Sequence, residues 1–494
     1  MIKPQYETYR YTGEIARLQS QSIVECRLPG SEIGSILAVQ AKAVPAECVC
    51  ADGEVRYGGK LLLCIVYEDL ERRICRAERG AEFFHKAEGA LVTPACFAKT
   101  AFTIDNISHR REGSGLYISV IVGAESNVYG GKQLEYLIAG EGLIVKKQPT
   151  ALSKTICVSG ETEAEDEFDT DYVGDVLLHG ETAVVTACRV SAGQLDLEGE
   201  ITLNVCVLNS DETLCSYERI IPFTMQIPCE EAFGNVKASA RAFVKSATLN
   251  ASVDEEKGKC KMLFSYCLSA DCFISGKEEI EVACDAFSPA VEISVSEKKD
   301  GGRYLTNHTR KVERVSGVAA LSPAVEGDYA LETAVLPKAE ITIKKGEHGY
   351  EAEGLVSAEV LLKGADGGRR ASRLSLPFVF PVDGDGEEWE ADCLVCGLNI
   401  RRKKDGETEA EATVKVGLRS YEKTEWAYIG EVIEGEKREE SDAAVSVYLP
   451  RAGEELWEVA KRLSRDPEEL KKSNPELEFP VREGERIFVY RQIK

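Results

Sequence analysis

Histidine and cysteine are the side chains that most often hold a metal ion or carry redox chemistry, and in this chain both are scattered. The five histidines fall in five separate segments, none with the HExxH spacing of a helical zinc site: His85, His109, His179, His308 and His348. Cys393 and Cys396 form a lone CxxC pair, without the second pair that a structural zinc site needs. On a β-strand these two thiols point to opposite faces. We therefore expect no metal site, no redox centre and no cofactor.

Phosphate binding and glycoside hydrolysis also lack their motifs. Gly58-Gly59 and Gly367-Gly368 are turn glycines outside any GxxxxGK[ST] pattern, whose backbone amides would cradle phosphates. Carboxylate pairs are frequent, but a chain with 84 Asp and Glu residues contains such pairs by coincidence. We therefore expect a protein that is not an enzyme. An active site assembled from distant strands is the alternative, and a cleft of titratable groups with shifted pKa values would reveal it.

Charge and composition narrow the class of protein. A net charge of −24 argues against nucleic-acid binding, because neutralising phosphates requires a basic surface. No run of about 18 apolar residues occurs, so no transmembrane segment is expected. The first residues are polar and charged, unlike a secretory signal peptide, which indicates a cytoplasmic protein. In a reducing cytoplasm the 17 scattered cysteines are expected to pack as small apolar residues; cross-linking in an insoluble shell is the alternative.

The elements that would position any site are mostly strands. Apolar and polar residues alternate over 195–207, 118–122 and 414–418, which is the period of a half-buried strand. Turn clusters such as Asp52-Gly53 and Asp366-Gly367-Gly368 separate these runs. The sequence therefore predicts a mainly β body.

The body also contains an internal repeat. Glycine-led strands at Gly59, Gly199 and Gly354 match one another and are followed by similar return strands and charged turns. The spacing predicts three tandem β-sandwich or barrel-like units over residues 1–148, 149–300 and 301–430; two units plus a divergent segment is the alternative. Residues 431–444 are rich in charge and poor in large apolar groups, so we expect a linker there.

Beyond the linker the periodicity changes. A short strand from Val445 precedes a segment in which Leu456, Val459, Ala460 and Leu463 recur at helical spacing. A second helix is predicted to begin after an Asp466 cap, and a closing strand follows near Ile487. We expect a small strand–helix–helix–strand module over residues 445–494. Its basic and acidic residues are equal in number, so the module is neutral.

This module resembles a LysM domain. The resemblance rests on the stretch from Tyr448 to Leu463, on Pro467 to Pro475 and on Val481 to Ile487. It implies a βααβ fold that binds peptidoglycan or chitin-type glycans containing N-acetylglucosamine. The two loops that would form the groove are residues Ala452, Gly453, Glu454, Glu455 and Leu456 on one side and Asn474, Pro475, Glu476, Leu477, Glu478 and Phe479 on the other.

Two features of the module bear on its ligand. LysM domains usually carry Asp-Thr or Asp-Ser after the turn glycine, and here Glu454-Glu455 replaces that hydroxyl with two carboxylates. We expect these carboxylates to crowd the groove with negative charge, which favours a protein partner over a glycan. Trp457 lies about 100° around the helix from Leu456, so it is either a contact residue for a partner or the edge of the core.

The whole chain resembles a sporulation family, the SipL-like spore coat morphogenetic proteins, which join SPOCS-type β domains to a C-terminal LysM domain. The resemblance rests on the repeated glycine strands, on the segment from Leu28 to Ile33 and on the order of the units. It implies a scaffold in the mother-cell cytoplasm at the forespore surface. Its module would bind a SpoIVA-like morphogenetic ATPase, with other coat proteins as further partners. A glycan-binding protein is the alternative.

Overall fold

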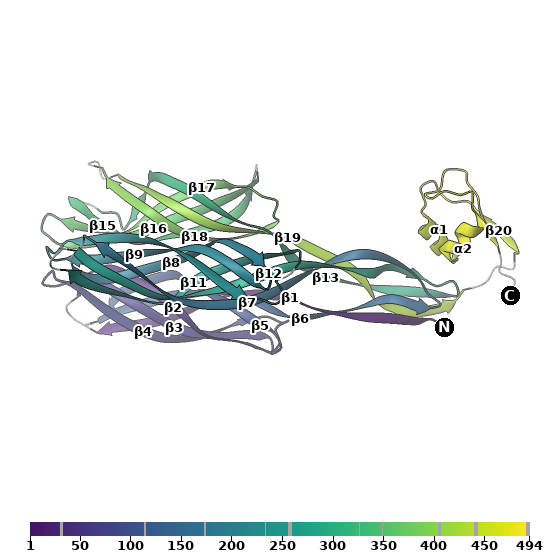
Figure 1. The fold of residues 1–494 in the computed structure, drawn as a ribbon, viewed down its shortest axis with the longest axis horizontal. Helices are drawn as coiled ribbons and strands as arrows, with labels where there is room; N and C mark the ends of the chain where they lie inside the picture. The colour runs from purple at the N-terminus through teal and green to yellow at the C-terminus, as the bar shows by residue number, and fades with distance from the viewer. Residues whose placement is uncertain are drawn as a thin grey trace.

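The computed structural model describes residues 1–29, 33–112, 115–171, 174–232, 234–254, 259–325, 327–347, 349–403, 407–438 and 443–490. The described residues form a mainly β molecule, with a broad body at one end, a narrow stalk, and a small module near the far end of the stalk (Figure 1). None of the described helices is long and apolar enough to cross a membrane.

The body is built from three units that repeat one topology. The first contains β1 (Lys3–Pro29), β2 (Ile33–Ala51), β3 (Glu54–Asp69), β4 (Ile74–Glu88), β5 (Phe97–Glu112) and β6 (Gly115–Glu141). The second contains β7 (Ile144–Thr170), β8 (Gly174–Ser191), β9 (Gln194–Asn209), β10 (Leu214–Pro228), β11 (Val236–Asp254) and β12 (Lys259–Phe287). The third contains β13 (Val291–Val318), β14 (Ala320–Ser322), β15 (Tyr329–Gly346), β16 (Gly349–Gly364), β17 (Arg369–Val382), β18 (Glu388–Arg402) and β19 (Thr408–Lys437).

Each unit consists of two antiparallel sheets. One sheet holds the first, last and next-to-last strands, in the orders β1-β6-β5, β7-β12-β11 and β13-β19-β18. The other holds the strands between them, in the orders β2-β3-β4, β8-β9-β10 and, with β14 at its edge, β14-β17-β16-β15. The second unit therefore starts at Ile144 and the third at Val291, earlier than the starts at 149 and 301 expected from the sequence.

Apolar and polar residues alternate along the strands, so one face of each sheet is buried against the partner sheet of its unit. Four residues of β9 are almost completely buried: Leu195, Leu197, Leu203 and Val205. They share one core cluster with buried residues of β11 and β12 in the facing sheet. Corresponding clusters fill the first and third units. The strand periods seen in the sequence are thus the inward faces of three separate sandwich cores.

The three matched glycines occupy one structural position in the three units. A Cβ built on Gly59, Gly199 or Gly354 would meet the carbonyl oxygen of the preceding strand and the ring of a phenylalanine on the following strand. Those phenylalanines pair directly with the glycines across the sheet, as Gly199 does with Phe223. Only a residue without a side chain fits beneath the ring, which explains why the glycine recurs.

The first and last strands of each unit run on past the sandwiches and form the stalk. Three two-stranded ribbons (β1 with β6, β7 with β12, β13 with β19) pack together there, as the ribbon drawing shows (Figure 1). Two apolar clusters fill the space between them, one around Leu134, Leu152 and Trp426 and one around Leu137 and Ile429. All three units contribute to both clusters, so the stalk ties the ends of the three units together.

The linker expected at 431–444 is wrong over its first half. β19 continues to Lys437 and pairs with β13, and Val432 is buried in the stalk cluster with Ile2 and Val291. The segment is polar because only every second residue turns inward, so a few apolar residues suffice to hold it. The rest of the expected linker includes residues 439–442, which lie outside the described part of the chain. The same holds for residues 30–32 of the Leu28–Ile33 segment.

Buried polar contacts also join the three units at the other end of the body. The backbone amide of Arg369 donates to Glu68 of the first unit (3.2 Å). Its guanidinium pairs with Glu332 of its own unit (2.8 Å) and donates to the carbonyl oxygen of Glu212 in the second unit (2.5 Å). An apolar cluster with members from all three units, including Leu37, surrounds this point. The body is therefore joined at both ends.

Candidate functional site

The C-terminal module holds most of the residues singled out by sequence. It comprises β20 (Val445–Tyr448), α1 (Leu456–Leu463), α2 (Pro467–Ser473) and β21 (Ile487–Tyr490), with β20 and β21 paired antiparallel. α2 begins as predicted, because the Asp466 carboxylate accepts hydrogen bonds from the amides of Glu468 (2.8 Å) and Glu469 (3.3 Å). Val459, Ala460 and Leu470 lie in one small core with Ile487.

The first loop of the expected groove contains exposed and buried positions. Ala452 and Gly453 are exposed, Gly453 with a positive φ of 90°. Glu455 is exposed at the N-cap of α1, where its amide donates to Glu458 (3.1 Å). Leu456 is half-buried against the module core.

Glu454 is buried, and its charge is already neutralised. It accepts hydrogen bonds from the Tyr448 hydroxyl (3.1 Å) and the Arg451 amide (3.2 Å), and it forms an ion pair with Arg462. Desolvation raises the pKa of Glu454, but these donors and the Arg462 cation outweigh it and hold the pKa below its usual value. The expected crowding of the groove by two carboxylates is therefore wrong for Glu454, which braces its own loop.

The second loop is divided in the same way. Pro475, Glu476 and Glu478 are exposed, whereas Leu477 and Phe479 are half-buried against the module core. Asn474 is buried: its side chain donates to the carbonyl oxygens of Leu470 (3.0 Å) and Phe488 (2.8 Å) and accepts from the Phe488 amide (2.8 Å). Asn474 thus ties α2 to β21, and its amide group is fully used inside the module.

Backbone hydrogen bonds join the first loop to the segment that follows the second. The Gly453 amide donates to the Val481 carbonyl oxygen (2.8 Å), and the Val481 amide donates to the Glu454 carbonyl oxygen (3.0 Å). The two sides of the expected groove are therefore held by a fixed frame. The positions left exposed along it are Ala452, Gly453, Glu455, Pro475, Glu476 and Glu478.

Trp457 contacts the stalk. Its indole Nε1–H donates to Asp285 Oδ2 (2.7 Å), and its ring lies edge-on to Phe287 at 5.2 Å between centroids. Lys461, one turn further along α1, forms an ion pair with both oxygens of Asp285 (2.6 and 2.9 Å). Asp285 stands next to a register shift in the pairing of β12 with β7. The sequence predicted Trp457 either at a partner contact or at the edge of the core. The half-buried ring packs at the edge of the module core, and it also docks the module onto the stalk of the same chain.

The Asp285 carboxylate is ionised at neutral pH. Partial burial raises its pKa, but Lys461 and the Trp457 indole outweigh that effect and hold the pKa below the usual value. Asp285, Phe287 and Lys461 were not singled out by sequence. They are ordinary residues in local terms, and only the docking of two segments more than 170 residues apart gives them a role.

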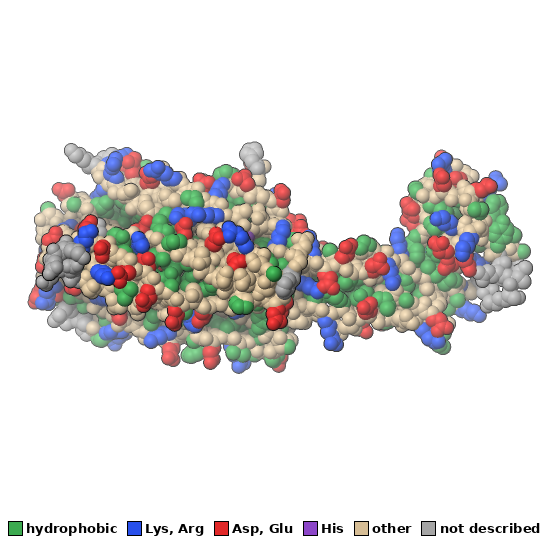
Figure 2. Space-filling model, in the orientation of Figure 1, with side chains coloured by type: hydrophobic (Ala, Val, Ile, Leu, Met, Phe, Trp, Pro, Cys, Tyr) green, Lys and Arg blue, Asp and Glu red, His purple; other side chains and the backbone are tan. Residues whose placement is uncertain are grey.

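One face of the β20–β21 sheet is apolar and exposed. Val445 pairs with Tyr490 and Val447 with Phe488, so these side chains share a face, and their relative exposures run from 42% to 51%. Leu449, just beyond β20, is 67% exposed. We call these five residues the apolar face. Hydrophobic side chains gather on the side of the module where β20 lies (Figure 2). Contiguous apolar surface of this kind is typical of interaction sites.

The residues considered for metal or redox chemistry stay apart. In the described part of the chain, no group of three or more His, Cys, Asp or Glu side chains could hold a metal ion. Cys393 and Cys396 are free thiols in separate apolar clusters. Burial, reinforced by the nearby Arg419 cation, lowers the pKa of His308 to about 4, so this imidazole is neutral at pH 7. His348 lies outside the described residues.

Comparison of the chain with protein-family models, with curated proteins and with solved structures finds no match. The function of the site is therefore argued from its own geometry.

Proposed function

We propose that the protein is a non-enzymatic scaffold in spore coat assembly, and that its LysM-like C-terminal module binds a SpoIVA-like morphogenetic ATPase at the forespore surface in the mother cell. The observation that carries the proposal is the apolar face, an exposed apolar surface on a small module near the far end of a stalk. Its members Val447, Phe488 and Tyr490 are large side chains that would lose water-exposed area on contact with a protein.

The body supports a spacer role. Three sandwiches joined by the buried Arg369 contacts and by the stalk clusters hold the module away from the bulk of the protein (Figure 1). A scaffold needs such separation, because the part that binds a partner must reach it without steric conflict from the rest.

Glycan binding through the loop groove is the second candidate, and the side chains there favour it less. Sugar recognition relies on a few placed polar groups. Two of the polar side chains expected in the groove, Glu454 and Asn474, are consumed by contacts inside the module. The exposed positions that remain for a glycan are Ala452, Gly453 and Pro475 and the three carboxylates Glu455, Glu476 and Glu478.

The test compares two ligands on the full-length chain. The double variant Val447→Glu with Phe488→Glu places two charges on the apolar face. Val379→Glu with Ile23→Glu, at two exposed apolar residues of the body (64% and 68%), is the matched control. The proposal predicts that the purified ATPase captures the parent and the control but not the double variant. Capture of all three with equal affinity, or pelleting with peptidoglycan without capture of the ATPase, would overturn it.

A further inference from the structure

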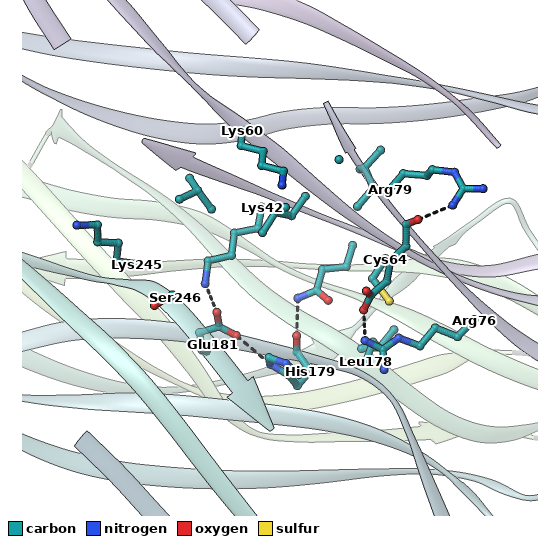
Figure 3. Close-up of a pocket in the computed structure, with 17 residues that line it drawn as sticks. Lys42, Lys60, Cys64, Arg76, Arg79, Leu178, His179, Glu181, Lys245 and Ser246 are labelled. Carbon is teal, nitrogen blue, oxygen red and sulfur yellow. Dashed lines mark hydrogen bonds and ion pairs between the residues drawn. The ribbon is translucent and has the colours of Figure 1, made fainter. Parts of the chain in front are cut away.

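The three units meet through equivalent interfaces, in which the outer face of one unit's second sheet is turned toward the next unit. Between the second and third units this space is filled, because Val184 of β8 packs with Leu394 and Cys396 of β18. Between the first and second units it is open. A cavity of about 590 Å³ lies there, lined by β2, β3 and β4 on one side and by β8 and β11 on the other (Figure 3). We call it the basic groove.

The floor of the basic groove is fixed by contacts across the interface. The Gln40 side chain donates to the carbonyl oxygen of His179 (2.6 Å), and Lys42 forms an ion pair with Glu181, which also meets the His179 ring (3.3 Å). These contacts hold the two units at a set separation. The groove is therefore a built feature of the fold.

The charge of the groove runs against that of the chain. Among the described residues that line it are five cationic side chains and only two carboxylates: Lys42, Lys60, Arg76, Arg79 and Lys245, with Glu78 and Glu181. The whole chain carries −24. A cationic surface on an acidic protein concentrates the local field and attracts anions.

One of these cations, Lys60, has no carboxylate partner among the described residues. Lys60 extends from β3 into the open space (Figure 3), over Gly80, which has no side chain to fill the space beneath it. Arg79 starts from the other face of β4, opposite the buried Leu63, and donates to the backbone carbonyl oxygen of Glu78 (2.7 Å). Lys42 and Arg76 are paired with Glu181 and Glu78. Lys60 is thus free to neutralise an incoming anion.

The equivalent space between the third and first units shows that this charge is not a consequence of the fold. The cavity there is about 420 Å³, and it is lined by a balanced set that includes Lys338, Arg373, Glu340, Glu359 and Asp105. Of these two cavities, the one between the first and second units has an excess of positive charge among its described lining residues.

The arrangement of the cations indicates the kind of anion. Lys60 lies near the middle of the β3–β4 pairing, and Arg76 lies opposite Val66, six residues further along β3, which corresponds to roughly 20 Å. A small anion cannot reach both cations, whereas an extended peptide of about six residues can. Apolar surface lies between the cations, where Leu62 is 41% exposed. A nucleic-acid strand would need more phosphate contacts than this groove offers.

We infer that the basic groove binds an acidic, extended segment of a partner protein that carries apolar residues between its carboxylates. This second site is independent of the C-terminal module, so the scaffold would hold two partners or two parts of one partner.

The test uses the full-length protein and a fluorescein-labelled octapeptide of alternating glutamate and leucine, followed by fluorescence anisotropy. The double variant Lys60→Glu with Arg76→Glu should weaken binding by about tenfold or more, since repulsion replaces two attractive charges. The control Lys299→Glu with Lys345→Glu makes the same charge change at exposed sites outside the groove and should leave binding nearly unchanged. Binding by the parent protein should also weaken as salt is raised.

Hydrogen exchange on the unaltered protein provides a readout that does not depend on the folding of a variant. The peptide should protect amides of β4 and β8, which are the sheet edges beside the groove. The inference is overturned if the parent does not bind the peptide, if both double variants bind alike, if protection appears elsewhere, or if a single-stranded oligonucleotide of similar length binds more tightly. Loss of ATPase capture in the apolar-face variant leaves this result untouched, so the two proposals fail separately.

Discussion

Asp285 supplies the polar contacts that dock the module onto the stalk, beside the buried Phe287, and replacing Asp285 with alanine should weaken the docking. Asp285 accepts from the Trp457 indole at 2.7 Å and pairs with Lys461 at 2.6 Å. The substitution removes both contacts and leaves the edge-on packing of Trp457 against Phe287.

The size of the effect follows from these contacts. A hydrogen bond to a charged group contributes about 1.5–3 kcal/mol. The Lys461 pair is partly exposed, with side-chain exposures of 46% and 26%, so it adds at most about 1 kcal/mol. Loss of about 1.5–4 kcal/mol lowers the ratio of docked to undocked module by roughly 10-fold to 1,000-fold. Asp285→Asn keeps a neutral acceptor for the indole and should lose about half as much.

Fluorine NMR of protein labelled with fluorotryptophan measures this directly, because the chain contains only three tryptophans. Trp457 should move to the chemical shift and solvent accessibility of an exposed indole in Asp285→Ala, and only partly in Asp285→Asn. Glu281→Ala, an exposed carboxylate on the same strand, is the control and should change nothing. An unaltered Trp457 signal in Asp285→Ala would refute the reasoning. Since the pKa of Asp285 is lowered by its partners, its contribution to docking is fully present above its ordinary value of 3.8 and is lost as the pH falls through the depressed pKa.

Three further outcomes are expected. Gly199→Ala should destabilise the protein by about 1–3 kcal/mol in urea unfolding, because the new methyl group meets the Phe223 ring. Gly131→Ala is the control and should not destabilise it, because Gly131 has open space around it. Equal effects of the two substitutions would contradict the equivalence of the repeated glycines. Arg419→Met should cost about 1.5–3 kcal/mol in the same assay, because the buried guanidinium (1% exposed) pairs with the partly buried Glu390 and Asp392. A loss below about 1 kcal/mol would count against that role. Burial raises the pKa of the Cys393 thiol to about 12, so iodoacetamide at pH 8 should modify it only after unfolding, and rapid labelling of the native protein would show that it is accessible.

Local patterns were sufficient to predict the elements of this fold. Alternation along β9 identified its inward face, and the Asp466 cap located the start of α2, because both signals depend on neighbours within a few residues. The glycine repeat is visible in the sequence because each of the three glycines must fit beneath a phenylalanine ring of the following strand. The reason for the repeat, however, is seen only in the structure, for example in the contact of Gly199 with Phe223.

The features that position the candidate sites depend on distant segments. The stalk was missed because a ribbon with few apolar residues, such as the one ending at Lys437, is stable only when two other ribbons cover it. Asp285 and Trp457 gave no joint signal across a separation of 172 residues. The basic groove gave none either, because Lys60 and Arg76 are ordinary surface cations until the second unit lies opposite them.

The central claim is that the C-terminal module binds the coat morphogenetic ATPase, and an affinity measurement with and without the module tests it most directly. The ATPase would be immobilised, and the full-length chain would be compared with a chain that ends at Arg438, which keeps the three units and the stalk. We predict that the full-length chain binds and that the shortened chain loses at least about 100-fold in affinity, or about 2.7 kcal/mol. Equal binding by both chains would contradict the claim.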